Sequence, residues 1–549
     1  MNKQRGLPLA AIALALLFHL RAPGVEGCTN LLVTRGASVD GSVMITYTCD
    51  GVFHPRLHFQ PAADHEPGDS LEIVDWHGKV RGKIEQVPHT YAYIRLMNEH
   101  QLAISETTFD GRPELENPEG LLHYWDLMQL ALQRAKTARE AIGVMTDLVA
   151  EYGYRSTGET FSIADPEEAW ILEMIGPGPG GEAALWVARR IPDGMISSHA
   201  NKARIGEFPL DDPEDCLFAE NVISFAIEKG YYDPSSGEAF RFCDVYCPPT
   251  PKNRRYASAR VWSIFRRAAP SLDLSPHYHR SVEGAEPYPL WIEPDEKLGL
   301  EGVFALMRDH YEGTPYDMTE GVDAGPFGTP NRWRPITWTV DSLEYAWERP
   351  VSTQQTGFSL VAQCRAHLPD PVGGVTWYGV DDTYTTCYVP LYCGIDDVPG
   401  PFAIGSLDEY DRESAWWVFN FVANYANLKY SYMIQDIQAV QRDLEGYLIA
   451  LQPAVEKTAE HLAAHDPDLL TRYLTDFSQT HAEMVVSRWR ELGDHLVAKY
   501  NDGYVRDEEG KAEEVGYPEG WLRRVLEDEP DRFRLQEKPA DVPETRLVD

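Results

Sequence analysis

Cys28 is the residue whose surroundings point most directly to chemistry, because it stands where a hydrophobic leader ends. The leader stops at Val25-Glu26-Gly27, and a cut before Cys28 would give one residue both a thiol and a free α-amine. The thiolate is a strong nucleophile, and an α-amine with a pKa of about 7.7–8.0 can act as a base near neutral pH. The sequence therefore predicts a nucleophile and its base within a single N-terminal residue.

Residues 1–27 have the pattern of a secretory signal peptide. Lys3 and Arg5 form a positive region, residues 7–20 are apolar, and small residues precede the predicted cleavage site. We therefore expect an exported protein, periplasmic or extracellular. No later segment reaches the roughly 18 uninterrupted apolar residues that a membrane-spanning helix needs.

Two other interpretations of Cys28 stay open on the residues alone. A bacterial lipoprotein also begins with a cysteine, which carries a lipid, although the acidic Glu26 is unlike the small residue usual at that position. Cys28 could also be half of a disulfide, since disulfides persist in exported proteins. The eight cysteines are too few for a disulfide-built scaffold, and the plausible local pairs are Cys243 with Cys247 and Cys387 with Cys393.

The composition limits the partners and cofactors of the chain. Its 86 Asp and Glu residues outnumber 49 Lys and Arg residues, and the formal net charge of −37 argues against nucleic acid and anionic membranes as partners. The spacing of Cys243 and Cys247 is a poor zinc signature, and no nucleotide-binding or zinc-protease motif is present. We predict neither a metal ion nor a cofactor.

The order of predicted elements favours an α+β fold. Strand-like residues 29–34 and 43–48 flank Asp40-Gly41, a strong hairpin signal, and a second hairpin is predicted around Asn98. Helical periodicity over residues 121–151 ends at Gly153. Further strands are expected at residues 160–164, 169–175 and 185–191. Strands, then a helix, then strands indicate layered sheets and helices rather than a doubly wound sheet.

The second half of the chain is predicted to change from loops to helices. Residues 230–345 are rich in Pro, Gly and Tyr, with helical pieces near 255–268 and 300–311. Strand character returns between residues 357 and 392. From about Arg412 to Tyr500 the pattern is helical, and Pro453 is expected to interrupt one helix.

Several blocks of the sequence, in the same order, resemble the bacterial dipeptidase A family of cysteine dipeptidases, which is related to the secernins. The blocks are residues 28–33, 37–42, 97–104, 161–165 and 192–205. That family is similar, more distantly, to penicillin V acylase and bile salt hydrolase, which are N-terminal-nucleophile hydrolases. The resemblance implies a four-layer αββα fold, with two sheets between two helical layers.

This resemblance also implies a division of the chain into three parts. Residues 1–27 would be the signal peptide, residues 28–405 the hydrolase domain, and residues 406–549 a helical C-terminal extension with a charged tail. We expect small peptides, above all dipeptides, as substrates, and a homo-oligomer is compatible with the sequence.

The resemblance implies a role for each of five residues. Cys28 would attack an amide carbonyl and form an acyl-thioester that water then hydrolyses. Asp50 would hold the α-amine, Asn98 and Asn201 would face the oxyanion, and Arg260 would lie near the nucleophile. One donor to an oxyanion is typically worth about 10²–10³ in rate.

One position departs from the family pattern. Where many relatives have an arginine three residues before the aspartate, this chain has Tyr47, which brings no charge at neutral pH. Either another cation substitutes, or the thiol pKa and the substrate preference differ. Cys49 could be mistaken for the nucleophile. We expect His199 to position its neighbours rather than act as a base.

The sequence thus predicts an exported cysteine dipeptidase that acts through Cys28. Within the same class, an acylase or amidase acting on N-acylated substrates is the alternative. A non-catalytic surface lipoprotein, lipidated at Cys28, is an alternative from a different class.

Overall fold

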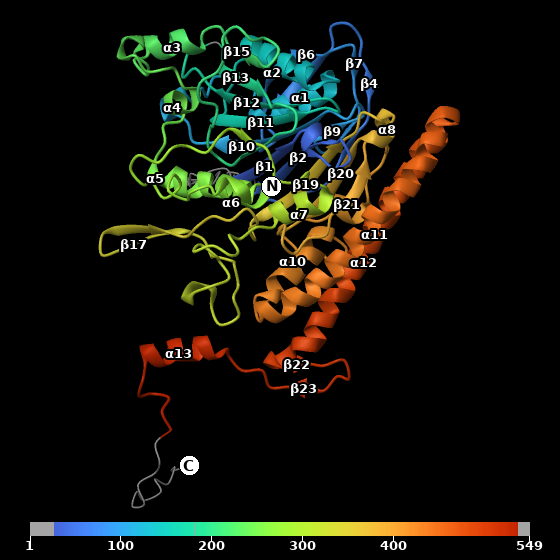
Figure 1. Cartoon of the computed structure of the whole chain (residues 1–549). Helices are drawn as coiled ribbons and strands as arrows, with labels where there is room; N and C mark the ends of the chain where they lie inside the picture. Colours follow the sequence, from blue (N-terminus) through green and yellow to red (C-terminus); the bar gives the residue numbers. More distant parts are fainter. Residues whose placement is uncertain (1–26, 182, 536–549) are drawn as a thin grey trace, which may run out of the picture.

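The computed structural model describes residues 27–181 and 183–535 (Figure 1). The predicted signal peptide lies outside these residues, except for Gly27, which is the first residue of strand β1. Two antiparallel sheets form the centre of the molecule, and helices lie around them (Figure 1).

The first sheet carries Cys28 and has seven strands in the order β16-β14-β1-β2-β19-β20-β21. They are β1 (Gly27–Val33), β2 (Val43–Asp50), β14 (Ile196–His199), β16 (Trp291–Ile292), β19 (Thr356–Cys364), β20 (Val375–Val380) and β21 (Val389–Tyr392). The first predicted hairpin is confirmed, because β1 and β2 pair antiparallel. In their register Cys28 lies opposite Cys49, and Gly27 lies opposite Asp50.

The second sheet has eight strands in the order β15-β13-β12-β11-β10-β9-β8-β3. They are β3 (Phe59–Gln60), β8 (Tyr93–Ile94), β9 (Met97–Asn98), β10 (Ala103–Phe109), β11 (Gly158–Ala164), β12 (Ala169–Ile175), β13 (Leu185–Arg190) and β15 (Cys216–Phe218). The two sheets pack face to face, with β1 and β2 against β10. Every residue of β1, β2, β11 and β12 is buried, so both faces of these strands are covered.

Two helices cover the second sheet where one was expected. Helix α1 (Tyr124–Arg134) packs on β10, and α2 (Ala138–Tyr152) packs on β11 and β12. The predicted single helix is broken because Thr137 starts a new one, its side chain accepting a hydrogen bond from the Glu140 N–H. Gly153 ends α2 with a φ of 75°, as predicted.

The C-terminal region is helical, as predicted. Helices α10 (Ala415–Ala426), α11 (Tyr430–His465) and α12 (Pro467–Tyr500) lie beside β20 and β21 (Figure 1). A buried ion pair between Arg308 and Glu445 fastens α11, with 2.6 Å between Nη2 and Oε1. The expectation that Pro453 interrupts a helix is wrong, because α11 continues through it. Proline removes one backbone hydrogen bond there, and the packing of this long helix outweighs that loss.

The remaining elements are shorter. The helices are α3 (Val222–Glu228), α4 (Phe242–Tyr246), α5 (Pro251–Asn253), α6 (Ala259–Ala268), α7 (Leu300–Met307), α8 (Asp370–Gly373), α9 (Gly400–Ala403) and α13 (Glu519–Asp528). The strands are β4 (Ala63–Asp64), β5 (Ser70–Val74), β6 (Val80–Glu85), β7 (His89–Thr90), β17 (Thr337–Val340), β18 (Leu343–Ala346), β22 (Val505–Arg506) and β23 (Ala512–Glu513). The structure is thus a mixed α+β fold with antiparallel sheets and a helical C-terminal region.

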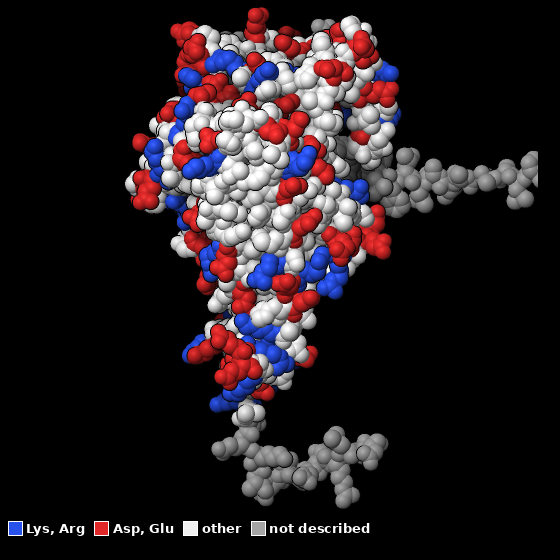
Figure 2. Space-filling view, turned by 90° about the vertical axis from the view of Figure 1, so that its right-hand side faces the viewer, with Lys and Arg blue, Asp and Glu red and all other residues white. Residues whose placement is uncertain are grey.

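The cysteines and the surface bear on two further expectations. All eight cysteines lie in the described residues and are free, so the two local pairs that the spacing made plausible, Cys243 with Cys247 and Cys387 with Cys393, are not disulfide-bonded in this structure. None of the helices in the described ranges is long and apolar enough to cross a membrane. On the side of the molecule where α11 and α12 lie, Lys and Arg are interspersed with Asp and Glu (Figure 2). That face therefore shows no continuous basic patch of the kind that binds nucleic acid.

Candidate active site

The backbone of Cys28 is held from both sides by Asn201 and Arg260. The Cys28 N–H donates to Oδ1 of Asn201 at 3.1 Å, and Nη1 of Arg260 donates to the Cys28 carbonyl oxygen at 2.6 Å. A second nitrogen of Arg260, Nη2, donates to the same Asn201 Oδ1 at 2.7 Å. The three residues predicted for one site are thus joined by a closed set of hydrogen bonds.

Arg260 reaches the start of β1 from helix α6, which follows a π-helical turn over Arg254–Ser258. Its guanidinium also binds the Thr29 hydroxyl and the Tyr256 carbonyl, and the side chain is fully buried. Burial and the positive charge of Arg349 lower the pKa of Arg260 to about 10, so it stays charged at neutral pH. Its donors orient the backbone of Cys28.

Asn201 contacts Cys28 with its carbonyl oxygen rather than its amide nitrogen. Its Nδ2 donates to the Thr108 carbonyl oxygen at 2.7 Å. The backbone of Asn201 is left-handed, with a φ of 55°, a conformation that asparagine tolerates better than most residues. In this arrangement Asn201 holds the Cys28 nitrogen, whereas the sequence predicted that its amide faces an oxyanion.

Asp50 lies beside the residue that precedes Cys28. Its buried carboxylate binds the Arg349 guanidinium and accepts a hydrogen bond from the Thr356 hydroxyl at 2.6 Å. A Cβ placed on Gly27 would lie 2.8 Å from the Tyr256 hydroxyl oxygen and 3.1 Å from Nη2 of Arg349. Only glycine therefore fits before Cys28 without moving these side chains. Asp50 is next to the site, and its carboxylate is already paired.

Asn98 is not brought into this group. Its Nδ2 donates to the carbonyl oxygens of Leu132 and Ala135, at 2.8 Å each, and its Oδ1 accepts from the N–H groups of His100 and Leu102. Both amide hydrogens are thus used to tie the β9 turn to the end of α1. The oxyanion role expected for Asn98 stays a prediction, and in this structure both hydrogens of its amide already have partners.

The sulfur of Cys28 faces the second sheet. Its Sγ lies 3.9 Å from the Tyr47 hydroxyl and 3.7 Å from Oε1 of Glu106 on β10. Tyr47 donates a short hydrogen bond to the same Oε1. Burial, a hydrogen bond with the Cys49 side chain and the negative charge of Glu106 raise the pKa of the Cys28 thiol well above its usual value. The thiol is therefore neutral at rest in this arrangement.

Comparison with known proteins identifies the family. A family model described as Peptidase family C69 matches residues 27–443, which is most of the chain. The chain belongs to peptidase family C69. The match begins one residue before Cys28, and it confirms the family resemblance expected from the sequence.

The curated relatives of this C69 peptidase carry matching names. A probable dipeptidase of Latilactobacillus sakei is 24% identical over 483 residues, covering 82% of this chain and 93% of that protein. A probable dipeptidase of Salmonella dublin is 26% identical, covering 68% of this chain and 82% of that protein. The dipeptidase A of Lactobacillus helveticus is 23% identical, with coverage of 73% and 82% respectively.

His199 lies between the two sheets of this C69 chain and holds them in register. One ring nitrogen, Nδ1, is 2.7 Å from the Thr107 hydroxyl, and Nε2 is 2.7 Å from the Ser162 hydroxyl. Complete burial and the positive charge of Arg204 lower the pKa of His199 well below its usual value. The imidazole is therefore neutral at physiological pH, and both of its ring nitrogens contact hydroxyl groups, in keeping with a positioning role.

This lowered pKa predicts a pH-dependent stability. An unfolded histidine binds a proton below about pH 6.5, whereas folded His199 stays neutral, so the unfolded state binds more protons in acid. The free energy of unfolding should therefore fall by up to about 1.4 kcal/mol per pH unit below pH 6.5 from this residue alone. Urea unfolding of the wild type and of His199→Gln at pH 7 and pH 5 measures it. Equal losses in the two proteins would contradict the assignment.

Four residues at this site were missed by the sequence prediction: Glu106, Glu159, Tyr256 and Arg349. A signal existed for the two glutamates, because each is an acidic residue within a strand-like run, Ala103–Phe109 or Gly158–Ala164. A charged residue inside a fully buried strand needs a partner. No comparable signal marked Arg349, which follows the hairpin β17–β18 and is 299 residues from Asp50 in the sequence.

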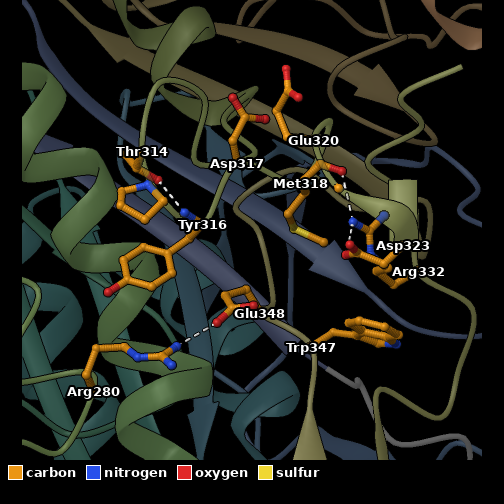
Figure 3. Close-up of a pocket in the computed structure, with 12 residues that line it drawn as sticks. Arg280, Thr314, Tyr316, Asp317, Met318, Glu320, Asp323, Arg332, Trp347 and Glu348 are labelled. Carbon is orange, nitrogen blue, oxygen red and sulfur yellow. Dashed lines mark hydrogen bonds and ion pairs between the residues drawn. The ribbon is translucent and has the colours of Figure 1, made fainter. Parts of the chain in front are cut away.

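A cavity of about 520 Å³ is lined by Trp347 and Glu348, the two residues that precede Arg349 in the sequence. Figure 3 shows its aromatic and acidic wall, in which Glu348 accepts a hydrogen bond from Arg280. The cavity is also lined by Tyr316, Asp317 and Trp347. Cys28 is not one of its lining residues, so the cavity is a neighbour of the site and not its centre. Residues 27–181 and 183–535 contain no cluster of three or more His, Cys, Asp or Glu side chains that could hold a metal ion.

Proposed function

We propose that this protein is a cysteine dipeptidase whose nucleophile is the Cys28 thiol, freed by cleavage of the Gly27–Cys28 bond. The observation that carries the proposal is that Asn201 and Arg260 hydrogen-bond to the backbone nitrogen and the backbone carbonyl oxygen of Cys28. Cys28 is the second residue of the region that matches the C69 family. Curated relatives of the chain are named dipeptidases.

Cleavage would convert the Cys28 N–H into an α-amine that Asn201 already contacts. The sulfur then attacks the carbonyl carbon of a dipeptide, the C–N bond breaks, and an acyl-thioester forms while the second amino acid leaves. Water hydrolyses the thioester and frees the first amino acid. Arg260 fixes the Cys28 carbonyl and Asn201 fixes its nitrogen, so that the sulfur keeps one orientation through both steps.

We propose that part of the substrate binds in the space that Gly27 occupies before cleavage. The side chains around it are the Tyr256 hydroxyl, the Arg349 guanidinium and Asn201 Oδ1. Cleavage removes Gly27, and these polar groups can then meet the amide and the charged ends of a dipeptide. Arg349 is the cation nearest to that place, so a substrate carboxylate is the group it would bind.

The two facing sheets with helices outside them support an N-terminal-nucleophile hydrolase fold of four αββα layers. We further propose export through residues 1–27, based on their signal-like sequence. An exported enzyme with this activity would release free amino acids outside the cytoplasm.

Hydrolysis of a substrate panel tests the proposal. Purified protein whose chain begins at Cys28 is incubated with dipeptides, tripeptides and N-acylated amino acids, and released amino acids are quantified by mass spectrometry. We expect dipeptides to be cleaved at least tenfold faster than the other two classes. Faster cleavage of the N-acylated amino acids would favour the acylase alternative. That alternative is kept open by Tyr47, which stands where many relatives have an arginine. No hydrolysis of any class by a chain that begins at Cys28 would overturn the proposal.

A further inference from the structure

The environment of the Cys28 sulfur differs from that of its backbone. The backbone lies among the cationic groups of Arg260 and Arg349, but the sulfur points at Tyr47 and at the carboxyl of Glu106. Glu106 lies on β10 in the opposite sheet and is fully buried. An anion beside a thiol opposes thiolate formation unless it takes the proton itself.

We infer that Glu106 is a further catalytic residue, which accepts the proton of the Cys28 thiol as the sulfur attacks the substrate. This inference rests on the proposed function and adds a second base on the sulfur side of Cys28. Its Oε1 is 3.7 Å from Sγ, and Tyr47 donates to that same oxygen and so fixes its direction. Proton transfer moves one negative charge from oxygen to sulfur and leaves the total charge of the buried site unchanged.

A second buried carboxyl, that of Glu159, lies near Glu106, and only one of the two carries a negative charge. The Thr108 hydroxyl lies between them, 3.5 Å from Oε2 of Glu106 and 2.8 Å from Oε1 of Glu159. Burial and the negative charge of Glu106 raise the pKa of Glu159 well above its usual value. Two carboxyls this close do not both ionise, and we assign the charge to Glu106 because the Tyr47 hydroxyl and the Cys28 thiol both donate to its Oε1.

The protons balance over one catalytic cycle. In acylation the S–H bond breaks, an O–H bond forms on Glu106, and the new S–C bond leads to an acyl-thioester. The leaving amine takes its proton from the α-ammonium of the cleaved Cys28. In deacylation the attacking water gives a proton to that α-amine, and Glu106 returns its proton to the sulfur as the C–S bond breaks.

The groups that face Glu106 come from four elements. They are Cys28 on β1, Tyr47 on β2, Glu159 on β11 and Tyr124 on α1, together with Tyr154 in the loop before β11. Burial raises the pKa of Glu106 above its usual value, although hydrogen bonds from its neighbours act in the opposite direction. The acid limb of the kcat profile should therefore lie above about pH 4.3, the usual value for glutamate, and should report Glu106.

The substitutions Glu106→Gln and Glu159→Gln form a matched pair, because each replaces one buried carboxyl of the same network. We expect Glu106→Gln to lower kcat by about 10²–10⁴-fold and to remove the acid limb, since the amide cannot take a proton. Glu159→Gln should lower kcat less than tenfold, because the amide resembles the protonated carboxyl. Circular dichroism and thermal melting establish that both variants are folded.

Alkylation of Cys28 by iodoacetamide gives a readout that needs no substrate. Peptide mass mapping separates Cys28 from Cys49, and the rate is measured between pH 6 and pH 10. Loss of the Glu106 charge should lower the thiol pKa. At pH 10, where hydroxide can take the proton in place of the carboxylate, Glu106→Gln should therefore be alkylated as fast as the wild type or faster, although its kcat is reduced. Slower alkylation at pH 10 together with slower catalysis would indicate a structural role and overturn the inference.

Two other results would also overturn it. One is a Glu106→Gln variant with kcat within tenfold of the wild type, and the other is a Glu159→Gln variant that loses as much as Glu106→Gln. If Glu106→Gln does not fold, Glu106→Asp replaces it and should keep an acid limb at reduced kcat. Failure of the proposed function is recognised separately, because dipeptide hydrolysis by Cys28→Ala would then match the wild type.

Discussion

Replacing Cys28 by alanine is expected to lower kcat for dipeptide hydrolysis by about 10⁴–10⁶-fold, the loss usual when a covalent nucleophile is removed. In the proposed mechanism the sulfur is the atom that forms the acyl-thioester, so its loss removes the covalent step. The neighbouring thiol is the natural control, because Cys49 lies directly across the β1–β2 pair from Cys28. Cys49 lies within β2 and has no route to a free α-amine.

The Cys49→Ala variant should therefore keep kcat within about tenfold of the wild type, since it loses only one buried sulfur next to the site. Both variants are assayed with the same dipeptide, and melting curves confirm that they are folded. Equal losses in the two variants would show that the thiols act as a pair. Wild-type activity in Cys28→Ala would contradict the proposal that Cys28 is the nucleophile.

The second large effect is expected at Asn201 and Arg260, which hold the nucleophile through a shared oxygen. Asn201→Ala removes the acceptor for both the Cys28 N–H and Nη2 of Arg260. A displacement of about 1 Å at a reacting group can cost about 10²-fold in rate, so we expect kcat to fall by roughly that factor. Arg260→Lys should cost about as much, because lysine cannot reproduce the fixed fork of donors.

A conservative variant separates this positioning role from general damage. Asn201→Asp keeps an acceptor oxygen and tolerates the left-handed backbone at this position, so it should lose less activity than Asn201→Ala. The double variant of Asn201→Ala with Arg260→Lys should be little worse than either single variant, since both act on the same oxygen. Independent, multiplying losses would contradict a shared role.

Much of the fold follows from local sequence signals. The hairpin at Asp40-Gly41 and the end of α2 at Gly153 are set by residues with special backbone preferences, and both are as predicted. The break between α1 and α2 was missed because Thr137 competes with the periodicity around it. The break predicted at Pro453 is wrong, because tertiary packing stabilises α11 on both sides of a residue that disfavours a helix.

The site was harder to predict because its residues meet only through the tertiary fold. The motif blocks contain Cys28 and Asn201, and the family resemblance added Arg260. The structure joins these three residues by hydrogen bonds. The structure does not join Asn98 to these three, and a turn asparagine has the same local pattern whether it faces a substrate or ties down a helix. Glu106 was missed because its importance depends on the packing of β10 against β1, which no local pattern contains.

The most direct measurement of the central claim is the mass and N-terminal sequence of the active protein, followed by labelling with a reagent specific for 1,2-aminothiols. We predict a chain that begins at unmodified Cys28 and takes up one equivalent of the reagent, with activity lost in proportion to labelling. An active protein that retains Gly27, or that carries a lipid on Cys28, would contradict the account.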